Sequence, residues 1–310
     1  MKKILVTGGT VFVSKYVAGY FRDNGYEVYV LNRNTKPQLE NVKLIEADRH
    51  SIGDKLKNIH FDLVLDVTAY NEGDIADFVT ALNSFDTYIM ISSSAVYPET
   101  GVQPFKEQSE MAENKFWGQY GTDKIAAEKK LLELVPDAYI LRPPYLYGPM
   151  NNVYREAFVF ECAMQNRTFY LPKDGEMKMQ FLHVKDLCRF IECILEKKPQ
   201  NHIFNVGNKD SVSIKEWVDL CYEVVGKTPA YVKVYDDIEQ RLYFSFYNYE
   251  YYLDVQNQYE IMPSTIDLKE GLREAFEWYK DNADQVNTKP YFEFIEKNFS
   301  DTRGILGSNK

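Results

Sequence analysis

Tyr120 and Lys124 stand four residues apart in the segment QYGTDKIAAEKK, within a pattern that predicts a helix over residues 114–135. Side chains at this spacing share one face of a helix. A phenol beside an ammonium group can give and take a proton, because the positive charge favours the phenolate. About 25 residues earlier, the strand-like segment MISSSAVYP supplies hydroxyls where an α/β sheet binds its ligand. These groups together indicate proton-transfer chemistry.

The segment TGGTVFVSKYV follows the apolar run KILV and looks like the phosphate-binding turn of a dinucleotide-binding protein. Such a turn has glycines at three fixed positions, which here hold Gly8, Val11 and Ser14. The N–H groups of the following helix still face the turn, so an anion can bind there. A plain strand-to-helix turn would give the same fragment. We predict a working site of altered fit, whose further residues are Thr10, Val11, Phe12 and Val13.

The ends of the next strand-like segments carry residues suited to the same cofactor. Asn32 and Arg33 favour NADP, with NAD as the alternative, because an arginine accommodates the 2′-phosphate and no acidic residue is present to bind the ribose hydroxyls. They could equally be two solvated loop residues. Asp48 could reach an adenine amino group. Thr68 and Ala69 are small enough to let a cofactor lie flat across the strand ends.

Strand-like and helix-like segments alternate through the first half of the chain, and the strands are continuous apolar runs. This pattern is typical of a parallel sheet covered on both faces. We predict an α/β protein with a doubly wound parallel Rossmann sheet and a smaller, interleaved C-terminal α/β substrate domain. The predicted Rossmann domain comprises residues 1–150 and 181–208, and the substrate domain comprises 151–180 and 209–310. Within these domains, a helix is predicted over residues 181–197.

The 310 residues carry a formal net charge of -10, which on average repels phosphate backbones. No apolar run approaches the roughly 20 residues that span a bilayer, and the N-terminus reads as a first strand and not as a signal peptide. The four cysteines form no C-x-x-C pair, so buried free thiols in a reducing cytoplasm are expected. The four histidines show no metal-ligand spacing, and we predict no metal site.

Taken together, the motifs resemble the extended short-chain dehydrogenase/reductase family, the group of NAD-dependent epimerases and dehydratases. They occur in family order and at family spacing over about nine-tenths of the chain. The matching segments are TGGT at 7–10, SSSAVY at 92–97, YGTDK at 120–124, RPPYLYGP at 142–149, FLHVKDL at 181–187 and FNVGN at 204–208.

The resemblance implies a role for each residue of the site. Tyr120 matches the general acid/base, and Lys124 matches the lysine that holds the nicotinamide ribose and favours the tyrosinate. Ser93 matches the hydroxyl that binds the substrate oxygen, with Ser94 as the alternative. Half ionisation of a tyrosine at pH 7 requires roughly 4 kcal/mol. One cation about 4 Å away supplies energy of that order at an effective dielectric of about 20.

The resemblance therefore implies an NAD(P)-dependent oxidoreductase or epimerase that transfers hydride at an oxygen-bearing carbon. A sugar-like or nucleotide-sugar substrate is the family default, and a homodimer through the helix that bears Tyr120 is common in the family. Ser94 and Ala95 occupy positions that hold an acidic pair in sugar 4,6-dehydratases, which argues against that reaction. Met179 stands where many nucleotide-sugar enzymes have an arginine for the diphosphate, and Lys178 beside it would point the other way.

A narrower resemblance leads to the branch that contains the chloroplast stem-loop RNA-binding proteins and their bacterial relatives. The segments GPMNNVYREAFVF and QFLHVKDL carry it. RNA binding on the same fold, with a vestigial cofactor site, is therefore the rival hypothesis. The net charge of -10 and the intact Tyr120–Lys124 pair argue against it. We expect no specific RNA binding, and we expect the 24 tyrosines to serve mainly in the core.

Overall fold

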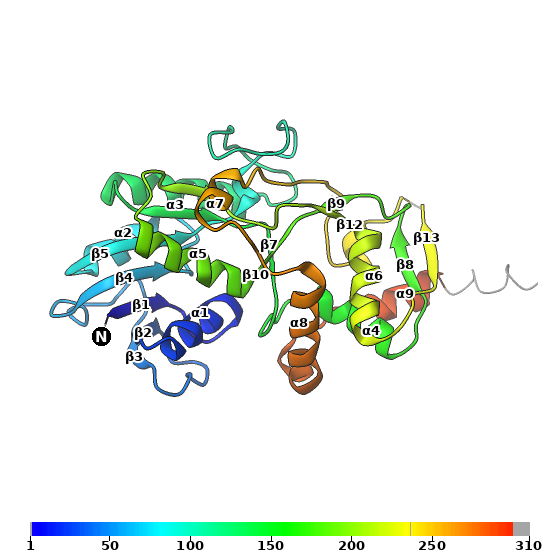
Figure 1. Ribbon diagram of the computed structural model, residues 1–310, viewed down its shortest axis with the longest axis horizontal. Coiled ribbons are helices and arrows are strands. Elements are labelled where there is room, and N and C mark those ends of the chain that lie inside the picture. The colour runs from blue at the N-terminus through cyan, green and yellow to red at the C-terminus, as the bar shows by residue number, and fades with distance from the viewer. Residues whose placement is uncertain (1, 236, 300–310) are drawn as a thin grey trace, which may run out of the picture.

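The N-terminal half of the computed structural model, which describes residues 2–235 and 237–299, is built on one parallel sheet (Figure 1). Its strands are β1 (Lys3–Thr7), β2 (Glu27–Asn32), β3 (Lys43–Glu46), β4 (His60–Asp66), β5 (Ser84–Ile91), β6 (Tyr139–Arg142) and β11 (Ile203–Asn205). The strand order is β11-β6-β5-β4-β1-β2-β3, and all neighbours are parallel. This order confirms the predicted doubly wound Rossmann sheet.

Two pairs of helices cover the two faces of this sheet. On one face lie α1 (Phe12–Asp23) and α5 (Val184–Lys197), and on the other lie α2 (Glu72–Ala81) and α3 (Gln119–Leu134). The central strands are apolar on both sides because both sides are buried. Val6 of β1, for example, packs under α1, while its neighbour Leu5 packs under the α2–α3 layer.

The carboxyl ends of β1 and β4 are tied together at the point where the strand order reverses. The Thr7 hydroxyl donates to Asp66 Oδ1 at 2.8 Å and accepts from the backbone N–H of Val67 at 2.9 Å. Open α/β sheets bind their ligands in the crevice at such a reversal. The carboxyl ends of β1 to β4 are therefore the place where a ligand is expected.

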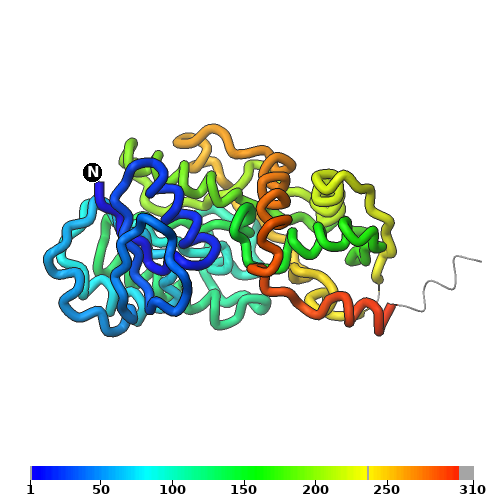
Figure 2. Tube along the Cα trace, turned by 90° about the horizontal axis from the view of Figure 1, so that it is seen from below, coloured from blue at the N-terminus to red at the C-terminus, as the bar shows by residue number. Residues whose placement is uncertain are grey.

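The C-terminal half packs several helices and short strand pairs beside the sheet, along the long axis of the molecule (Figure 2). Its helices are α4 (Glu156–Met164), α6 (Ile214–Val225), α8 (Leu268–Asn282) and α9 (Tyr291–Phe299). Its strand pairs are β7 (Tyr145–Tyr147) with β10 (Phe181–His183), β9 (Lys178–Met179) with β12 (Val212–Ser213), and β8 (Phe169–Pro172) with β13 (Tyr231–Val234). The short α7 (Gln256–Ile261) lies against α5 and β11, and the 3-10 helices are η1 (Ser94–Val96), η2 (Gln240–Leu242) and η3 (Ala283–Gln285).

An aromatic core fills the C-terminal half. The tyrosine-rich segment after η2 contributes Tyr243, Tyr249 and Tyr251, all buried, in line with the expectation that tyrosines serve mainly in the core. The same cluster holds Tyr97 from the predicted Rossmann domain and Trp217 from the predicted substrate domain. The two halves thus share a core, and the exact domain division stays a prediction.

Two predicted helices begin later than the sequence pattern suggested. The prediction of a helix from residue 181 was wrong at its start, because residues 181–183 pair with β7 as strand β10. His183 then caps α5 by accepting from the backbone N–H of Lys185. In the predicted helix over 114–135, Asn114 instead bonds to the Tyr97 carbonyl, and Gly118 has a φ of 49°. The helix α3 consequently starts at Gln119.

We expected buried free thiols and no segment that spans a membrane. Cys162, Cys188 and Cys221 are buried free thiols, whereas Cys193 is partly exposed. Within the described residues, no helix has the length and apolar character that crossing a bilayer requires.

Candidate active site

A cleft of about 370 Å³ opens at the carboxyl ends of β1 to β4. Five residues that sequence analysis assigned to cofactor binding lie on its wall: Gly8, Asn32, Arg33, Asp48 and Thr68. Its volume is within the range of about 300–1,000 Å³ typical of small-molecule sites. The tertiary structure thus brings the ends of four strands to one cavity.

The glycine turn between β1 and α1 has a conformation that the sequence pattern did not predict. Gly8 has a φ of 92°, and a Cβ on it would lie 2.8 Å from Ser14 Oγ. Ser14 is buried and donates to the Val11 carbonyl at 2.9 Å, so a serine is accommodated at the third fingerprint position. The first residue of α1, Phe12, has a φ of 32°, a region that favours glycine. The left-handed backbone conformation is therefore found at Phe12, one residue after Val11.

The remaining predicted turn residues have side chains that contact the protein. Phe12 and Val13 are partly buried and pack against the core on the α1 face of the sheet. Thr10 and Val11 are also partly buried. Within the described residues, these four residues are not among those that line the 370 Å³ cleft.

Asn32 and Arg33 differ in how they are held. The Asn32 amide donates to the Gly8 carbonyl at 2.7 Å and to Gln38 Oε1 at 3.0 Å, so it braces the glycine turn. Arg33 is exposed, and within the described residues its guanidinium has neither a hydrogen bond nor an ion pair. Arg33 is therefore free to bind an anion at the rim of the cleft.

Arg49 and Tyr70 also line the cleft, although sequence analysis missed them. Arg49 pairs with Asp66 at 2.8 Å and donates to Thr68 Oγ1 at 3.2 Å. Burial alone would raise the pKa of the fully buried Asp66, but the charge and hydrogen bonds of Arg49 hold it below its usual value. Both missed residues directly follow predicted ones, Asp48 and Ala69, and that adjacency was the available signal.

Ser93, Tyr120 and Lys124 gather at the ends of β4 and β5. Lys124 is 2% exposed, and its ammonium donates to the carbonyls of Ala69 at 2.7 Å and Ile91 at 3.0 Å. The ammonium lies 6.0 Å from the centre of the Tyr120 ring. Ser93 lies close enough to Tyr120 to lower the pKa of its phenol as a hydrogen-bonding neighbour. The three predicted catalytic residues therefore share one site.

The electrostatics of this site differ from those of an activated tyrosine. Burial raises the pKa of Tyr120 above its ordinary value, and the nearby Ser93 only partly opposes this. Burial lowers the pKa of Lys124 to about 8. The Lys124 ammonium donates to two backbone carbonyls and lies 6.0 Å from the centre of the Tyr120 ring, and the pKa of Tyr120 stays above its ordinary value. At neutral pH, Tyr120 is protonated and Lys124 carries its charge.

The Tyr70 ring lies near both Lys124 and Tyr120. Its ring centre lies 5.2 Å from the Lys124 ammonium and 6.5 Å from the Tyr120 ring centre. The Tyr70 side chain is half exposed, so it can rotate away when a ligand enters.

A buried ion pair holds the helix that carries Tyr120 and Lys124. Glu128 of α3 and Arg142 of β6 pair at 2.5 Å, and both side chains are at most 2% exposed. Glu128 also accepts from the Ser92 hydroxyl, and Arg142 donates to the Tyr97 hydroxyl at 2.8 Å. Because Ser92 precedes Ser93, this network fixes α3 relative to the strand end that carries the predicted catalytic serine.

An aromatic wall borders Tyr120 on the side of the C-terminal half. The Trp117 ring lies 6.2 Å from Tyr120, 6.4 Å from Tyr145 and 5.2 Å from Tyr247 between ring centres. Arg155 lies over Tyr145, with its guanidinium carbon 4.8 Å from the ring centre. A substrate bound beside Tyr120 would therefore contact aromatic rings and a cation.

The positions where the chain departs from the family pattern can also be placed. Met179 is 1% exposed within the aromatic core, so it offers nothing to a ligand. Lys178 pairs with Glu216 at 3.5 Å on the outside of the β9–β12 pair. Ser94 and Ala95 are buried in η1. Neither an arginine nor an acidic pair is present at these positions.

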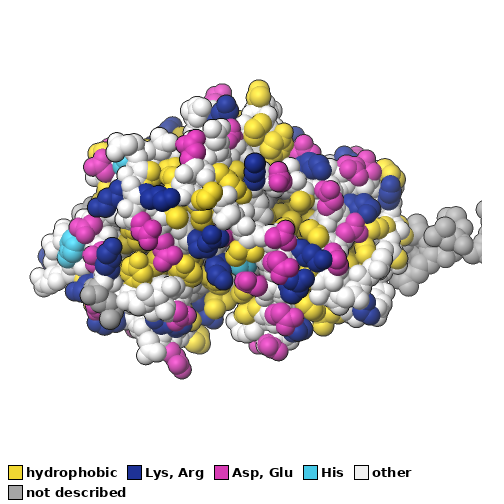
Figure 3. All heavy atoms as spheres, in the orientation of Figure 1, with side chains coloured by type: hydrophobic (Ala, Val, Ile, Leu, Met, Phe, Trp, Pro, Cys, Tyr) yellow, Lys and Arg dark blue, Asp and Glu magenta, His cyan; other side chains and the backbone are white. Residues whose placement is uncertain are grey.

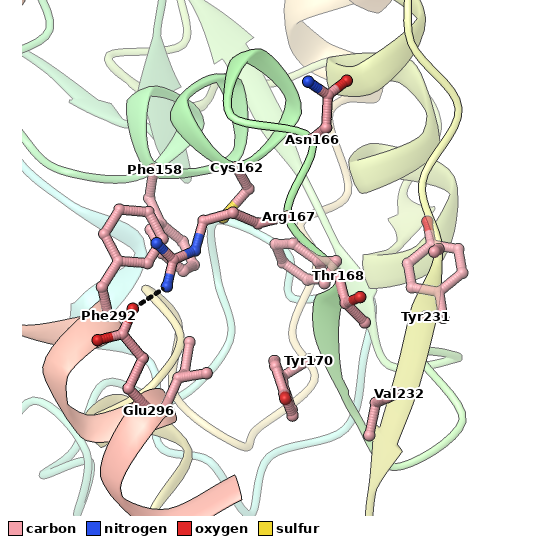
Figure 4. A pocket seen from close by; sticks show the side chains of 13 residues that line it. Phe158, Cys162, Asn166, Arg167, Thr168, Tyr170, Tyr231, Val232, Phe292 and Glu296 are labelled. Atoms are coloured by element: carbon pink, nitrogen blue, oxygen red, sulfur yellow. Dashed lines mark hydrogen bonds and ion pairs between the residues drawn. The ribbon is translucent and has the colours of Figure 1, made fainter. Parts of the chain in front are cut away.

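A larger cavity, of about 650 Å³, lies at the far end of the C-terminal half, between α4, β8, β13 and α9 (Figure 4). Its arginine, Arg167, points toward Glu296, with which it forms an ion pair, and stacks 4.1 Å above the Phe292 ring. Its walls are mainly aromatic and aliphatic side chains. We place the candidate site at the strand ends and not in this 650 Å³ cavity, because Ser93, Tyr120 and Lys124 lie at the strand ends.

Comparison with known proteins shows the family to which the chain belongs. The model of the NAD dependent epimerase/dehydratase family matches residues 4–207, about two-thirds of the chain. The chloroplast stem-loop binding protein of 41 kDa b of Arabidopsis thaliana is 23% identical over 89% of this chain and 78% of its own length. A putative UDP-glucose 4-epimerase of Methanocaldococcus jannaschii is 24% identical over 90% of this chain and 99% of its own.

Solved structures share the fold. A putative epimerase from Burkholderia cenocepacia superimposes with a TM-score of 0.74 at 18% identity, over 89% of this chain and 97% of its own. The UDP-glucuronic acid 4-epimerase from Bacillus cereus, in complex with UDP-glucuronic acid and NAD, gives a TM-score of 0.72 at 17% identity, over 90% of this chain and 99% of its own.

Proposed function

The chain belongs to the NAD dependent epimerase/dehydratase family, and from this we propose that it is an enzyme that transfers hydride at an oxygen-bearing carbon of a sugar-like or nucleotide-sugar substrate. The catalytic residues in this proposal are Ser93, Tyr120 and Lys124. The observation that carries it is the meeting of these three side chains beside the cleft at the strand ends. RNA binding requires no such arrangement.

A nicotinamide dinucleotide fits the residues of this cleft. Gly8 leaves no side chain between the turn and Ser14, and the wall at Asn32, Arg33, Asp48 and Thr68 is polar. These residues would hold the adenosine half, with NADP favoured by Arg33 and NAD as the alternative. Lys124, buried next to the Ala69 carbonyl, would hold the nicotinamide ribose. When bound, the nicotinamide would accept or supply the hydride.

The side chains of the site divide the proton chemistry between them. Tyr120, neutral at rest, donates its proton to a substrate carbonyl oxygen as reduction proceeds, and it takes the proton back from a hydroxyl in the reverse direction. The Ser93 hydroxyl binds the same oxygen and stabilises negative charge that develops on it. Burial lowers the pKa of Lys124 to about 8, so its ammonium is mostly charged at neutral pH. That charge favours the tyrosinate that forms transiently.

Similar proteins support a nucleotide-sugar substrate as the first choice, because the putative UDP-glucose 4-epimerase and the UDP-glucuronic acid 4-epimerase are named for such substrates. The serine and alanine at positions 94 and 95 argue against 4,6-dehydration. Cytoplasmic location and a homodimer through α3 stay predictions.

Changing Arg33 and Val11 should separate cofactor preference from cofactor affinity. Arg33→Ala should weaken NADP by about ten- to a hundredfold and leave NAD unchanged, because one charge-assisted contact is worth roughly 1.5–3 kcal/mol. Val11→Gly should tighten both cofactors, because it removes an isopropyl group at the turn position that approaches the pyrophosphate. The effect should be the same for NADP and NAD, since both carry the same pyrophosphate. Calorimetric titration of the three proteins with NADP and NAD measures both effects.

Either of two outcomes would contradict this assignment. If the parent protein binds NAD more tightly than NADP, Arg33 has no role in preference. If Val11→Gly loosens both cofactors, the valine is a required part of the turn. The left-handed φ of Phe12, directly after Val11, would then be the feature that the valine supports.

RNA binding is the second candidate function, because a stem-loop binding protein is among the relatives. On the face shown in Figure 3, basic and acidic side chains are interspersed over both halves. We therefore expect stem-loop RNA to bind no more tightly than the non-specific range of about 10⁻⁴–10⁻⁶ M, with an affinity that falls steeply as salt rises. A titration that gives nanomolar, sequence-dependent binding would reverse the order of the two functions.

A further inference from the structure

The Lys124 ammonium is shielded from solvent, although the proposed function requires a cofactor to reach it. Lys124 is 2% exposed. Within the described residues, two of its three ammonium donors are taken by the carbonyls of Ala69 at 2.7 Å and Ile91 at 3.0 Å. One donor remains for the nicotinamide ribose. A neighbouring side chain must therefore move before that ribose can reach the ammonium.

The rings of Tyr70 and Tyr120 both lie near this ammonium, with ring centres at 5.2 Å and 6.0 Å. Tyr120 is the proposed acid/base on the same helix as Lys124, and its ring centre lies 6.2 Å from that of Trp117. It has to stay in place for the chemistry. Tyr70 comes from the loop before α2 and is 52% exposed, so its ring can change rotamer quickly. Tyr70 is therefore the side chain that can uncover Lys124.

The backbone around Tyr70 is held on both sides. The Tyr70 N–H donates to Asp74 Oδ2 at 2.7 Å. The carbonyl of the preceding Ala69 accepts from Lys124, and Ala69 is fully buried. The following Asn71 caps α2 by accepting from the Asp74 N–H at 3.0 Å. Opening is consequently a rotation of the ring about its side-chain bonds, and the loop itself stays where it is.

Tyr70 stands between the cleft and the groups that would carry out the chemistry. It lines the 370 Å³ cleft together with Gly8 and Thr68. Its ring centre is also 6.5 Å from that of Tyr120. A dinucleotide with its adenosine half in the cleft and its nicotinamide ribose on Lys124 would therefore have to pass the Tyr70 ring.

The contact between the ring and the ammonium favours the covered arrangement. A cation near an aromatic ring is attracted by the negative face of the ring. A ligand that needs Lys124 has to break this contact, so its apparent affinity falls in proportion to the fraction of molecules that are open. The usual strength of such contacts corresponds to a ratio of covered to open molecules of about 2 to 30.

We propose that Tyr70 is a side-chain gate over Lys124, which must rotate away before the ribose of a nicotinamide dinucleotide can bind. The proposal rests on the proposed function, because it takes Lys124 as the group that holds the ribose. It adds a residue that controls access to the site without taking part in the reaction.

Calorimetric titration with NADP and NAD tests the gate. Tyr70→Ala removes the ring and should tighten both cofactors by about 2- to 30-fold. Tyr70→Phe keeps the ring and should bind both cofactors as the parent does. Tyr235→Ala is the matched control, because Tyr235 is an exposed tyrosine after β13, and it should also behave as the parent. An equal effect on both cofactors separates the gate from Arg33→Ala, which should change NADP alone.

Acetylation of Lys124 by acetic anhydride, read by peptide mass spectrometry, tests the gate without a cofactor. The limiting rate at high pH reports access to the amine and not its ionisation. This rate should be higher in Tyr70→Ala than in the parent or Tyr70→Phe. Lys129 is exposed on the same helix and should react equally in all three proteins. Both variants keep the backbone N–H that donates to Asp74, so their melting should match that of the parent.

Weaker cofactor binding in Tyr70→Ala would show that the ring is a contact of the bound cofactor, and it would overturn the gate. Unchanged cofactor binding in Tyr70→Ala, or an unchanged acetylation rate of Lys124, would overturn it as well. A failure of the proposed function looks different. In that case none of the proteins binds NADP or NAD, while a faster reaction of Lys124 in Tyr70→Ala still supports the cover over the ammonium.

Discussion

Tyr120→Phe should reduce turnover by about 10²- to 10⁴-fold, because it removes the proposed general acid/base while keeping the ring. Cofactor binding and thermal stability should remain nearly unchanged. The phenol interacts with Ser93, and the ring itself keeps its contacts with Trp117 and Tyr70. The measurement is kcat with a substrate found by screening nucleotide sugars, alongside cofactor titration and melting of the same variant.

A tyrosine elsewhere provides the matched control for this substitution. Tyr235 is 68% exposed and follows β13, far from the strand ends, so Tyr235→Phe should behave as the parent. If Tyr120→Phe and the parent turn over at equal rates, the assignment of Tyr120 is wrong, and Ser93 would lose its proposed partner as well.

Breaking the buried pair between α3 and β6 should cost about 3–5 kcal/mol of unfolding free energy. Glu128→Gln leaves the Arg142 guanidinium charged, 1% exposed and without its counter-ion. Arg142→Met leaves the Glu128 carboxylate in the same situation. Denaturant unfolding of both variants measures the loss. Because the network also includes Ser92, surviving folded protein should show reduced turnover through misplacement of α3.

The exposed pair Lys130–Glu133 on the same helix is the control for that experiment. Glu133 is 65% exposed, so Glu133→Gln should change stability by less than about 1 kcal/mol. The double variant Glu128→Leu with Arg142→Met should be more stable than either single variant, because no unpaired charge remains. Single variants as stable as Glu133→Gln would contradict the view that this pair positions the site.

The cleft at the strand ends could largely be predicted, because its location follows from local pattern. Parallel strands that alternate with helices bring their carboxyl ends to one edge of the sheet. Residues that follow the first four strands, from Gly8 to Thr68, therefore line one cavity in the structure. That these residues bind a cofactor stays a prediction, and titration of Arg33→Ala and Val11→Gly with NADP and NAD tests it.

The parts that could not be predicted depend on contacts between distant segments. Residues 181–183 have a helix-like sequence, yet they pair with β7 as a strand. The left-handed φ falls on Phe12, and no residue pattern marks that position. Burial raises the pKa of Tyr120, and the carbonyls of Ala69 and Ile91 accept hydrogen bonds from Lys124. Helical spacing alone reveals neither of these features.

The sequence by itself determined the fold class, the strand ends that form the cleft and the helix face shared by Tyr120 and Lys124, because each of these follows from periodicity and spacing along the chain. Only the tertiary structure decided which charges are neutralised. Arg142 meets Glu128 fourteen residues away in sequence, whereas Arg33 at the cleft meets no carboxylate among the described residues. Ion pairing depends on which elements pack together, and that packing separates an arginine that stabilises the fold from one that is free to bind a ligand.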